Sequence, residues 1–273
     1  MVEKMLDGKV AIISGASYGM GKSMAELFAK EGAKVVMTAR GQEKLDAAVA
    51  ELRAMGCEVT GVAADNKKLD DVKRVIRTAL DTYGDLDIVI NNAAIGEQKM
   101  IDETDDEWLE HVYQTNVFGP FRFIREALKI FLPKNEGCII NISSVNGERP
   151  FCGASYTSSK GAINTLTKNV AMRLIDTNIR INAVAPGATV TPAHLANKAG
   201  RAAGRRQNAG IQQALHILPR PGMRPDGSGQ RLPVPCLGHG KARQGAGAAG
   251  LQWRVPVIAG YVKKHWILER STV

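Results

Sequence analysis

Two hydrophobic patterns alternate along the first 199 residues of the chain. Short apolar runs rich in Val and Ile are typical of buried parallel strands, and they occur at Lys9–Ser14, Lys34–Thr38, Glu58–Ala63, Leu86–Asn91, Gly137–Ser143 and Arg180–Val184. Longer segments with apolar residues three and four apart predict helices over Ser23–Lys30, Gln42–Met55, Leu69–Tyr83, Trp108–Phe131 and Ser158–Ile175. The alternation predicts an α/β fold, a doubly wound parallel sheet (Rossmann fold) with helices on both faces.

The pattern fails after Asn197. Residues 200–273 contain 12 of the 28 glycines and 6 of the 11 prolines, and they show neither helical nor strand periodicity. A length of 273 residues suits one large α/β domain. We therefore expect a single dinucleotide-binding and catalytic domain over residues 1–199, followed by an anomalous basic tail over residues 200–273.

The net charge of +9 comes from this tail, which holds 12 of the 36 Lys and Arg residues but only 2 of the 27 Asp and Glu residues. The remaining body is nearly neutral, so we expect no nucleic-acid partner. No apolar run approaches the roughly 20 residues of a membrane helix, and the amino terminus has no secretory pattern. The four cysteines lack paired spacing. We expect free thiols, no metal, no membrane partner and a cytoplasmic location.

A glycine-rich loop joins the first strand to the first helix. Gly15 allows a tight turn, Gly19 lets the backbone approach a pyrophosphate, and Gly21 lets helix and strand pack closely. The loop between these glycines contains Ser17, Tyr18 and Met20. Because the following helix presents free N–H groups and a positive dipole end, the loop predicts a dinucleotide site.

The end of the second strand bears on the choice of cofactor. NAD sites usually place an acidic side chain there to hold the ribose 2′-hydroxyl, but this chain has Ala39 followed by Arg40. A guanidinium can pair with a 2′-phosphate, so we expect NADP(H) to be preferred, with NAD(H) possible. Asp65, just past the third strand, is a candidate to accept from the adenine amino group or to cap the next helix.

A tyrosine and a lysine lie one helical turn apart at Tyr156 and Lys160. A free tyrosine has a pKa of about 10 and moves protons poorly at neutral pH, but a nearby ammonium lowers that pKa. The tuned phenol could give a proton to a carbonyl oxygen or take one from an alcohol. Ser144 follows the fifth strand, where its hydroxyl could bind the same oxygen.

Together these motifs resemble the short-chain dehydrogenase/reductase family. The glycine loop, Asn91-Asn92-Ala93, Asn116, Ser144, Tyr156, Lys160 and Pro186-Gly187 occur in the family's order and spacing, from residue 5 to about 197. The resemblance implies that Tyr156 is the general acid/base and Ser144 orients the substrate oxygen. Lys160 would hold the nicotinamide ribose and lower the tyrosine pKa.

The same resemblance implies further roles near the cofactor. Asn116 would bend its helix and hold a water of the proton relay, and Asn92 would lie beside the cofactor. Thr189 would meet the nicotinamide carboxamide, and Thr191 would make another cofactor contact. Two departures stand out: Ala94 replaces a frequent glycine, and Tyr18 stands where many NADP-using members carry Arg.

These residues predict an NADP(H)-dependent oxidoreductase that interconverts a secondary alcohol and a ketone. A catalytically inactive dinucleotide-binding scaffold is the alternative from another class, although a pure binder need not keep all four catalytic residues. Arg149, Phe151 and Cys152 suggest a bulky carbonyl or alcohol such as a hydroxysteroid; a 3-oxoacyl thioester is the other candidate. With an intact C-terminus, the resemblance implies a homodimer or homotetramer.

The tail itself suggests a shifted reading frame. Back-translation of residues 231–258 with suitable synonymous codons, read from the second base, permits ACLFLASDMAKHVRGQVLQVCNGAFL followed by a stop codon. This text resembles the family's last helix and last strand, which read close to FLASD…TGQ…VDGG. We therefore expect residues after about Gly200 to be a frameshifted version of the family's C-terminus; a divergent basic tail is the alternative.

Overall fold

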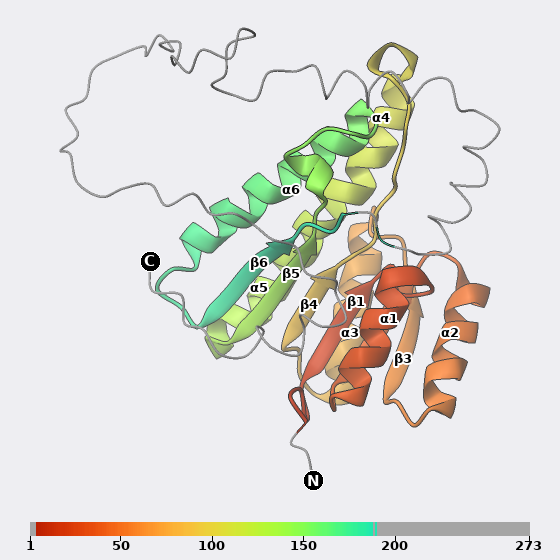
Figure 1. Cartoon of the computed structure of the whole chain (residues 1–273). Coiled ribbons are helices and arrows are strands. Elements are labelled where there is room, and N and C mark those ends of the chain that lie inside the picture. Colours follow the sequence, from red (N-terminus) through yellow and green to blue (C-terminus); the bar gives the residue numbers. More distant parts are fainter. Residues whose placement is uncertain (1–3, 188, 190–273) are drawn as a thin grey trace, which may run out of the picture.

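Six parallel strands form the central sheet of the computed structural model, which describes residues 4–187 and residue 189 (Figure 1). The strands are β1 (Val10–Ser14), β2 (Lys34–Ala39), β3 (Val59–Ala63), β4 (Ile88–Asn91), β5 (Gly137–Ile142) and β6 (Ile179–Val184). Their order in space is β3-β2-β1-β4-β5-β6. The direction of winding reverses between β1 and β4, and ligands of such sheets bind beyond the carboxyl ends at this switch point.

Helices cover both faces of the sheet, as the sequence predicted. They are α1 (Gly19–Lys30), α2 (Gln42–Ala54), α3 (Leu69–Tyr83), α4 (Asp106–Tyr113), α5 (Gly119–Lys134) and α6 (Ala154–Arg173). Within β1, Ala11 and Ile13 pack with α1 and α2, whereas Val10 and Ile12 pack with α3 and α5. Side chains of α6 join this second cluster. The doubly wound α/β fold is thus confirmed; the predicted tail over residues 200–273 lies outside the described residues.

The single helix predicted over Trp108–Phe131 is wrong in one respect. A π-helical turn, Gln114–Phe118, separates α4 from α5. Pro120, at the start of α5, has no N–H to donate to the carbonyl four residues earlier, which belongs to Asn116. The side chain of Asn116 is also fully engaged with neighbouring backbone and α6. Both features favour a local change of helical pitch at Asn116.

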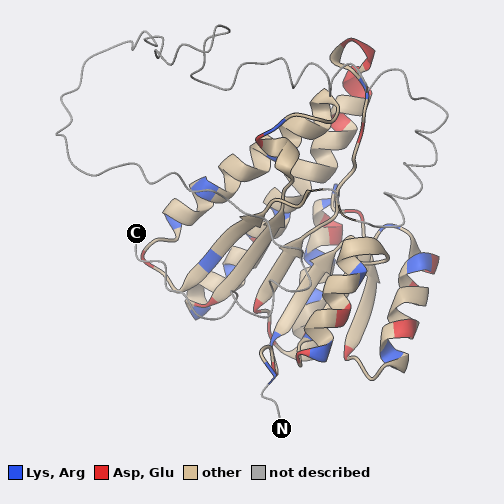
Figure 2. Ribbon diagram, in the orientation of Figure 1, with Lys and Arg blue, Asp and Glu red and all other residues tan. Residues whose placement is uncertain are grey.

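Positive and negative side chains are interspersed over the described part of the chain, mostly on helices and loops (Figure 2). One carboxylate is buried at the amino ends of the strands. Asp87 accepts hydrogen bonds from the backbone N–H of Val10 at 2.9 Å and from the Lys134 ammonium at 2.7 Å. Burial raises the pKa of Asp87, but these interactions outweigh it and hold that pKa below its usual range. This cluster fastens the sheet at the end away from the predicted site.

Candidate active site

The glycine loop leaves β1 at the switch point and has the geometry that its spacing predicted. Gly15 and Gly19 have φ angles of +66° and +58°, in the left-handed region that favours glycine. A Cβ on Gly21 would lie 2.2 Å from the carbonyl oxygen of Gly15 and 2.6 Å from the Asn92 amide nitrogen. Helix α1 therefore begins closer to the loop than any other residue type would allow.

Ser14 and Asn92 fasten this loop to the end of β4. The Asn92 amide donates to the carbonyl oxygens of Ser14 at 2.9 Å and Gly15 at 3.1 Å. In return, the Ser14 hydroxyl oxygen accepts from the backbone N–H groups of Asn92 and Ala93, at 3.0 and 3.1 Å. Asn92 thus acts on the loop itself. Sequence reasoning missed Ser14, whose only signal was a hydroxyl at the last position of β1.

The start of α1 is suited to an anionic group. Its N-cap, Tyr18, makes no capping hydrogen bond and its side chain is exposed, and the first turn contains no acidic residue. The N–H groups of a helix start need acceptors, and phosphate oxygens supply them. The loop at Gly15, Ser17, Gly19, Met20 and Gly21 therefore fits a dinucleotide pyrophosphate, which the uncapped N–H groups at the start of α1 would hold.

The other predicted cofactor residues lie around the same edge. Arg40 is exposed directly after β2. Asp65 accepts from the backbone N–H of Lys67 at 3.0 Å and does not cap α3, whose N-cap is Lys68. The Thr189 hydroxyl donates to the carbonyl of Gly187 at 3.2 Å. Thr191 lies outside the described residues.

Helix α6 carries the predicted catalytic pair. It begins at Ala154, four residues earlier than the hydrophobic pattern indicated, so Tyr156 and Lys160 both lie within it. The Lys160 amine is buried and donates to the carbonyl of Ile142, the last residue of β5, at 2.7 Å. It lies 5.7 Å from the centroid of the Tyr156 ring. Ser144, two residues after the end of β5, lies close enough to the Tyr156 phenol for its hydroxyl to lower the pKa of that phenol. Strand β5 and helix α6 thus bring all three residues together.

Protonation in this cluster differs from the expectation that Lys160 lowers the pKa of Tyr156. Burial raises the pKa of Tyr156 above its usual range, and the nearby Ser144 hydroxyl opposes this in part. Burial also lowers the pKa of Lys160 to about 8. The physical reason is that both groups are desolvated and the lysine amine is directed to a backbone carbonyl. In this geometry Ser144 is the group that favours the phenolate.

Asn116 connects the π-turn to α6 and to the loop after β4. Its amide donates to the Ile95 carbonyl at 2.9 Å and to the Ser159 hydroxyl at 3.0 Å, and its oxygen accepts from the Ile95 N–H at 2.7 Å. Ser159 in turn donates to the Tyr156 carbonyl at 2.7 Å. Asn116 therefore lies two hydrogen bonds from the backbone of Tyr156, through a serine that sequence reasoning missed.

Glu97 is a second residue that sequence reasoning missed. Its side chain is buried and accepts from the backbone N–H of Tyr156 at 3.2 Å and from the indole of Trp108 at 3.1 Å. Because Tyr156 lies in the first turn of α6, the carboxylate caps this helix from another segment. Its only signal in the sequence was an acidic residue close after Asn91-Asn92.

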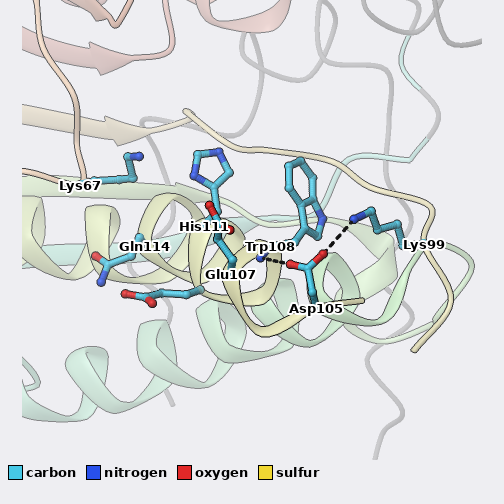
Figure 3. Close-up of a pocket in the computed structure, with 8 residues that line it drawn as sticks. Lys67, Lys99, Asp105, Glu107, Trp108, His111 and Gln114 are labelled. Carbon is cyan, nitrogen blue, oxygen red and sulfur yellow. Dashed lines mark hydrogen bonds and ion pairs between the residues drawn. The ribbon is translucent and has the colours of Figure 1, made fainter. Parts of the chain in front are cut away.

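Trp108 also lines a depression of about 540 Å³ along α4, shown in Figure 3. Its lining residues carry both signs of charge: Lys67, Lys99, Asp105, Glu107, Trp108, Glu110, His111 and Gln114. Lys99 and Asp105 lie 3.6 Å apart across it. None of the predicted catalytic or cofactor residues lines this depression, so it is separate from the candidate active site.

Comparison with known proteins identifies the class. The profile of the family described as "short chain dehydrogenase" matches residues 9–201. The chain belongs to this family, and it is an NAD(P)-dependent dehydrogenase/reductase. Within residues 4–187, no helix combines the length and the apolar character that crossing a membrane requires. Across the same described residues, no three His, Cys, Asp or Glu side chains are grouped to hold a metal ion.

The names of individual relatives refer to different substrates. The chain is 37% identical to 3beta-hydroxysteroid dehydrogenase 2 of Eggerthella lenta, over 68% of the chain and 73% of the relative. It is 36% identical to a 3-oxoacyl-(acyl-carrier-protein) reductase of Staphylococcus aureus, over 67% and 75%.

Two solved structures were determined with different nicotinamide cofactors. An actinorhodin polyketide ketoreductase with NADPH is similar at 32% identity and a TM-score of 0.69, covering 71% of this chain and 75% of that one. A Brucella melitensis 3-ketoacyl-(acyl-carrier-protein) reductase complexed with NADH is 34% identical with a TM-score of 0.66, covering 70% and 80%. These similarities support binding of a nicotinamide dinucleotide.

Proposed function

We propose that the protein interconverts a secondary alcohol and a ketone with NADP(H), and that Tyr156 moves the proton. The observation that carries this proposal is the meeting of Ser144, Tyr156 and Lys160 at the carboxyl edge of the sheet, the same edge from which the glycine loop leaves β1. When bound, the nicotinamide would supply a hydride to the carbonyl carbon in reduction and would accept one from the alcohol carbon in oxidation. The protein must bind the cofactor and the substrate, orient them, and give a proton to the carbonyl oxygen.

Each residue of the cluster has a distinct task in this proposal. Tyr156 donates its phenolic proton to the carbonyl oxygen during reduction and takes it back during oxidation. Its raised pKa keeps the phenol protonated at neutral pH, which suits it as the acid. Ser144 hydrogen-bonds the reacting oxygen. Lys160, with a pKa of about 8, is largely cationic at neutral pH and would hold the ribose hydroxyls.

Two classes of substrate fit, and the first is favoured. The loop between Ser144 and Tyr156 carries the exposed Phe151, and the half-buried Cys152 of the same loop lies near the phenol. An apolar surface at this place favours a bulky ketone or hydroxysteroid. The similarity to a hydroxysteroid dehydrogenase supports this choice, and the similarity to 3-oxoacyl reductases supports thioesters as the second class.

The test of the proposed function is turnover of Tyr156→Phe on a panel of ketones, hydroxysteroids and 3-oxoacyl thioesters, followed by NADPH absorbance. We expect kcat to fall by about 10²- to 10⁴-fold, the usual contribution of general acid–base catalysis, with NADPH still bound. Tyr83→Phe is the matched control, because the Tyr83 hydroxyl pairs with Thr60 on β3 and is remote from α6. Near-native turnover of Tyr156→Phe would contradict the assignment.

The preference for NADP(H) rests on Arg40. Its exposed guanidinium follows β2, and no described residue forms an ion pair with it, so it is available to a 2′-phosphate. Arg40→Asp should weaken NADPH binding much more than NADH binding, because a carboxylate repels the phosphate and can accept from a 2′-hydroxyl. Fluorescence titration of both cofactors measures this. A native protein that already binds NADH more tightly would refute the preference.

We also propose that the natural protein ends in the other reading frame after about Gly200, and then assembles as a homodimer or homotetramer in the cytoplasm. The family match ends at residue 201, beside the change in composition. Within the described residues β6 is an edge strand, which the shifted text would cover with a further strand. The chain as written should then be poorly soluble and inactive.

Intact mass of an active natural preparation tests this proposal. A mass of 29.4 kDa would contradict it, and a lower mass corresponding to termination after Val257 would support it. Size-exclusion chromatography with light scattering then gives the oligomeric state. Activity should then be measured on the protein with the C-terminus that the intact mass establishes.

A further inference from the structure

The hydroxyl of Ser144 receives two hydrogen bonds from one neighbouring residue. The backbone N–H of Asn146 and the side-chain amide Nδ2 of Asn146 both donate to the Ser144 Oγ, each at 3.1 Å. Ser144 is the N-cap of the short 3₁₀ helix Val145–Gly147 and is buried. A hydroxyl oxygen has two lone pairs, so both are taken by Asn146.

The orientation of the Asn146 amide is fixed from its other side. The backbone N–H of Phe151 donates to the Asn146 Oδ1 at 2.9 Å. A backbone N–H can only donate, so the oxygen of the amide must face Phe151 and the nitrogen must face Ser144. The loop that carries the predicted substrate contacts thus determines which end of Asn146 reaches the serine.

We propose that Asn146 is a positioning residue that makes Ser144 a hydrogen-bond donor. Because both lone pairs of the Oγ already accept hydrogen bonds from Asn146, Ser144 can interact with a third group only by donating its O–H. That proton can be directed to the Tyr156 phenol oxygen and to the substrate oxygen, both of which gain negative charge during the reaction. This inference rests on the proposed function, because it assumes that Ser144 acts on the reacting oxygen.

The adjacent serine, Ser143, also hydrogen-bonds an asparagine side chain, but in the opposite donor–acceptor direction. Ser143 Oγ lies 2.6 Å from the Oδ1 of Asn164 on α6, so there the serine donates and the asparagine accepts. Replacing an asparagine by aspartate therefore has different consequences at the two places. At Asn164 it keeps the acceptor that Ser143 uses, whereas at Asn146 it replaces the donor that Ser144 receives.

The decisive variant is Asn146→Asp. Its carboxylate keeps an acceptor for Phe151 and presents a second acceptor to Ser144, which captures the serine proton. We expect kcat to fall about 100-fold, the scale for losing one donor to a developing oxyanion, and to approach that of Ser144→Ala. NADPH affinity should stay within about twofold. Asn164→Asp is the matched control for an added carboxylate: it lies one turn from Lys160 and keeps the acceptor of Ser143, so its kcat should fall far less than that of Asn146→Asp.

A double variant separates proton capture from a through-space effect of the new charge. If the introduced carboxylate acts by capturing the Ser144 proton, Ser144→Ala/Asn146→Asp should be no slower than Ser144→Ala alone. An added loss in the double variant would show that the charge acts directly and would overturn the inference. Asn146→Ala removes the side-chain donor without adding an acceptor, so its loss should be smaller than that of Asn146→Asp.

The pH profile gives a readout that a structural defect would not produce. Below the pKa of the new carboxyl group, its neutral form can donate to Ser144 again, so relative activity of Asn146→Asp should rise as pH falls. Lys160 titrates near pH 8 and Tyr156 above its usual range, so neither produces such a rise. Glu97 and Cys152 also lie near Tyr156, but both are present in the native protein, so the ratio of variant to native activity at each pH isolates the new carboxyl group.

The failure of this inference and of the proposed function can be told apart. Native activity in Ser144→Ala would refute the role of Ser144 and with it the proposed function. Loss of activity in Ser144→Ala together with native kcat in Asn146→Asp would refute the role of Asn146 alone.

Discussion

The glycine loop and the tyrosine helix lie at the same edge of the sheet, but different interactions hold them in place. The loop is shaped by what is absent: a Cβ on Gly21 would lie 2.2 Å from the Gly15 carbonyl. The start of α6 is held by side chains: Glu97 accepts from the backbone N–H of Tyr156, and Ser159 is linked to Asn116. Backbone shape thus suits an extended phosphate group, and directed side chains suit a single reacting atom.

We call the glycine loop the loop half of the site and the start of α6 the tyrosine half. Because different interactions hold them in place, the two halves should respond differently to substitution. In the loop, adding one methyl group changes the backbone itself, and the damage should be to cofactor binding. In the tyrosine half, removal of one polar atom leaves the backbone intact and should affect turnover. Lys160 is the exception, since it lies on α6 and is also expected to hold the cofactor.

Lys160→Ala should therefore break the separation between the halves and have the largest effect. We expect kcat to fall by at least about 10²-fold and NADPH affinity to fall as well, because the amine that would hold and orient the nicotinamide ribose is lost. In the native protein, affinity should decrease as pH rises through about 8, where the Lys160 ammonium loses its proton. Stopped-flow turnover and cofactor titration across pH measure both effects.

Lys168→Ala is the control for this variant, because Lys168 lies on the exposed side of the same helix. It should keep native turnover and affinity. Loss of turnover in Lys160→Ala with unchanged cofactor affinity at every pH would place Lys160 in the tyrosine half alone.

Gly21→Ala should sharpen the comparison. The new Cβ meets a backbone carbonyl that cannot rotate away, so the loop must shift and the N–H groups at the start of α1 must move with it. We expect NADPH affinity to fall by more than about tenfold, corresponding to at least about 1.4 kcal/mol of binding free energy. Isothermal titration calorimetry measures it.

Gly56→Ala is the control that tests whether replacing a glycine elsewhere in the domain also weakens cofactor binding. Gly56 follows α2 with a φ of +76°, but a Cβ there would meet no atom within 4 Å. Its substitution should cost stability through backbone strain and leave cofactor affinity unchanged. An equal loss of affinity in both variants would show that Gly21 has no special place in the site.

The sequence predicted the fold and the loop half of the site better than the tyrosine half. Hydrophobic alternation located all six strands of the described sheet, because buried parallel strands are continuously apolar. Glycine spacing likewise predicted the loop. Ser14, Glu97 and Ser159 were missed because each acts through a partner distant in sequence, at separations of 78, 59 and 43 residues. The predicted direction of the Tyr156 pKa shift was wrong, because the shift is set by burial, which depends on the tertiary structure.

The smallest expected effect lies at the opposite end of the sheet from both halves. Asp87→Asn keeps an acceptor for the Val10 N–H but removes the charge that pairs with Lys134, at 2.7 Å, and with Lys9, at 3.4 Å. Hydrogen bonds to charged groups contribute about 1.5–3 kcal/mol each, so we expect about 2 kcal/mol lower free energy of unfolding. Because this cluster touches neither half, turnover per folded molecule should stay native.

The pH dependence of unfolding identifies the charge as the cause. The pKa of Asp87 is lower in the folded protein than its usual value, so its contribution is fully present above the unfolded-state pKa of about 3.9. It is lost as pH falls through the lower folded-state pKa. The stability difference between native and Asp87→Asn protein, measured by urea unfolding, should therefore shrink below about pH 4.

Asp81→Asn, on the exposed surface of α3, should change stability by less than about 0.5 kcal/mol. A difference for Asp87→Asn that stays constant down to about pH 3 would show that packing rather than charge holds this end of the sheet, and a loss of turnover would show that the two ends are coupled.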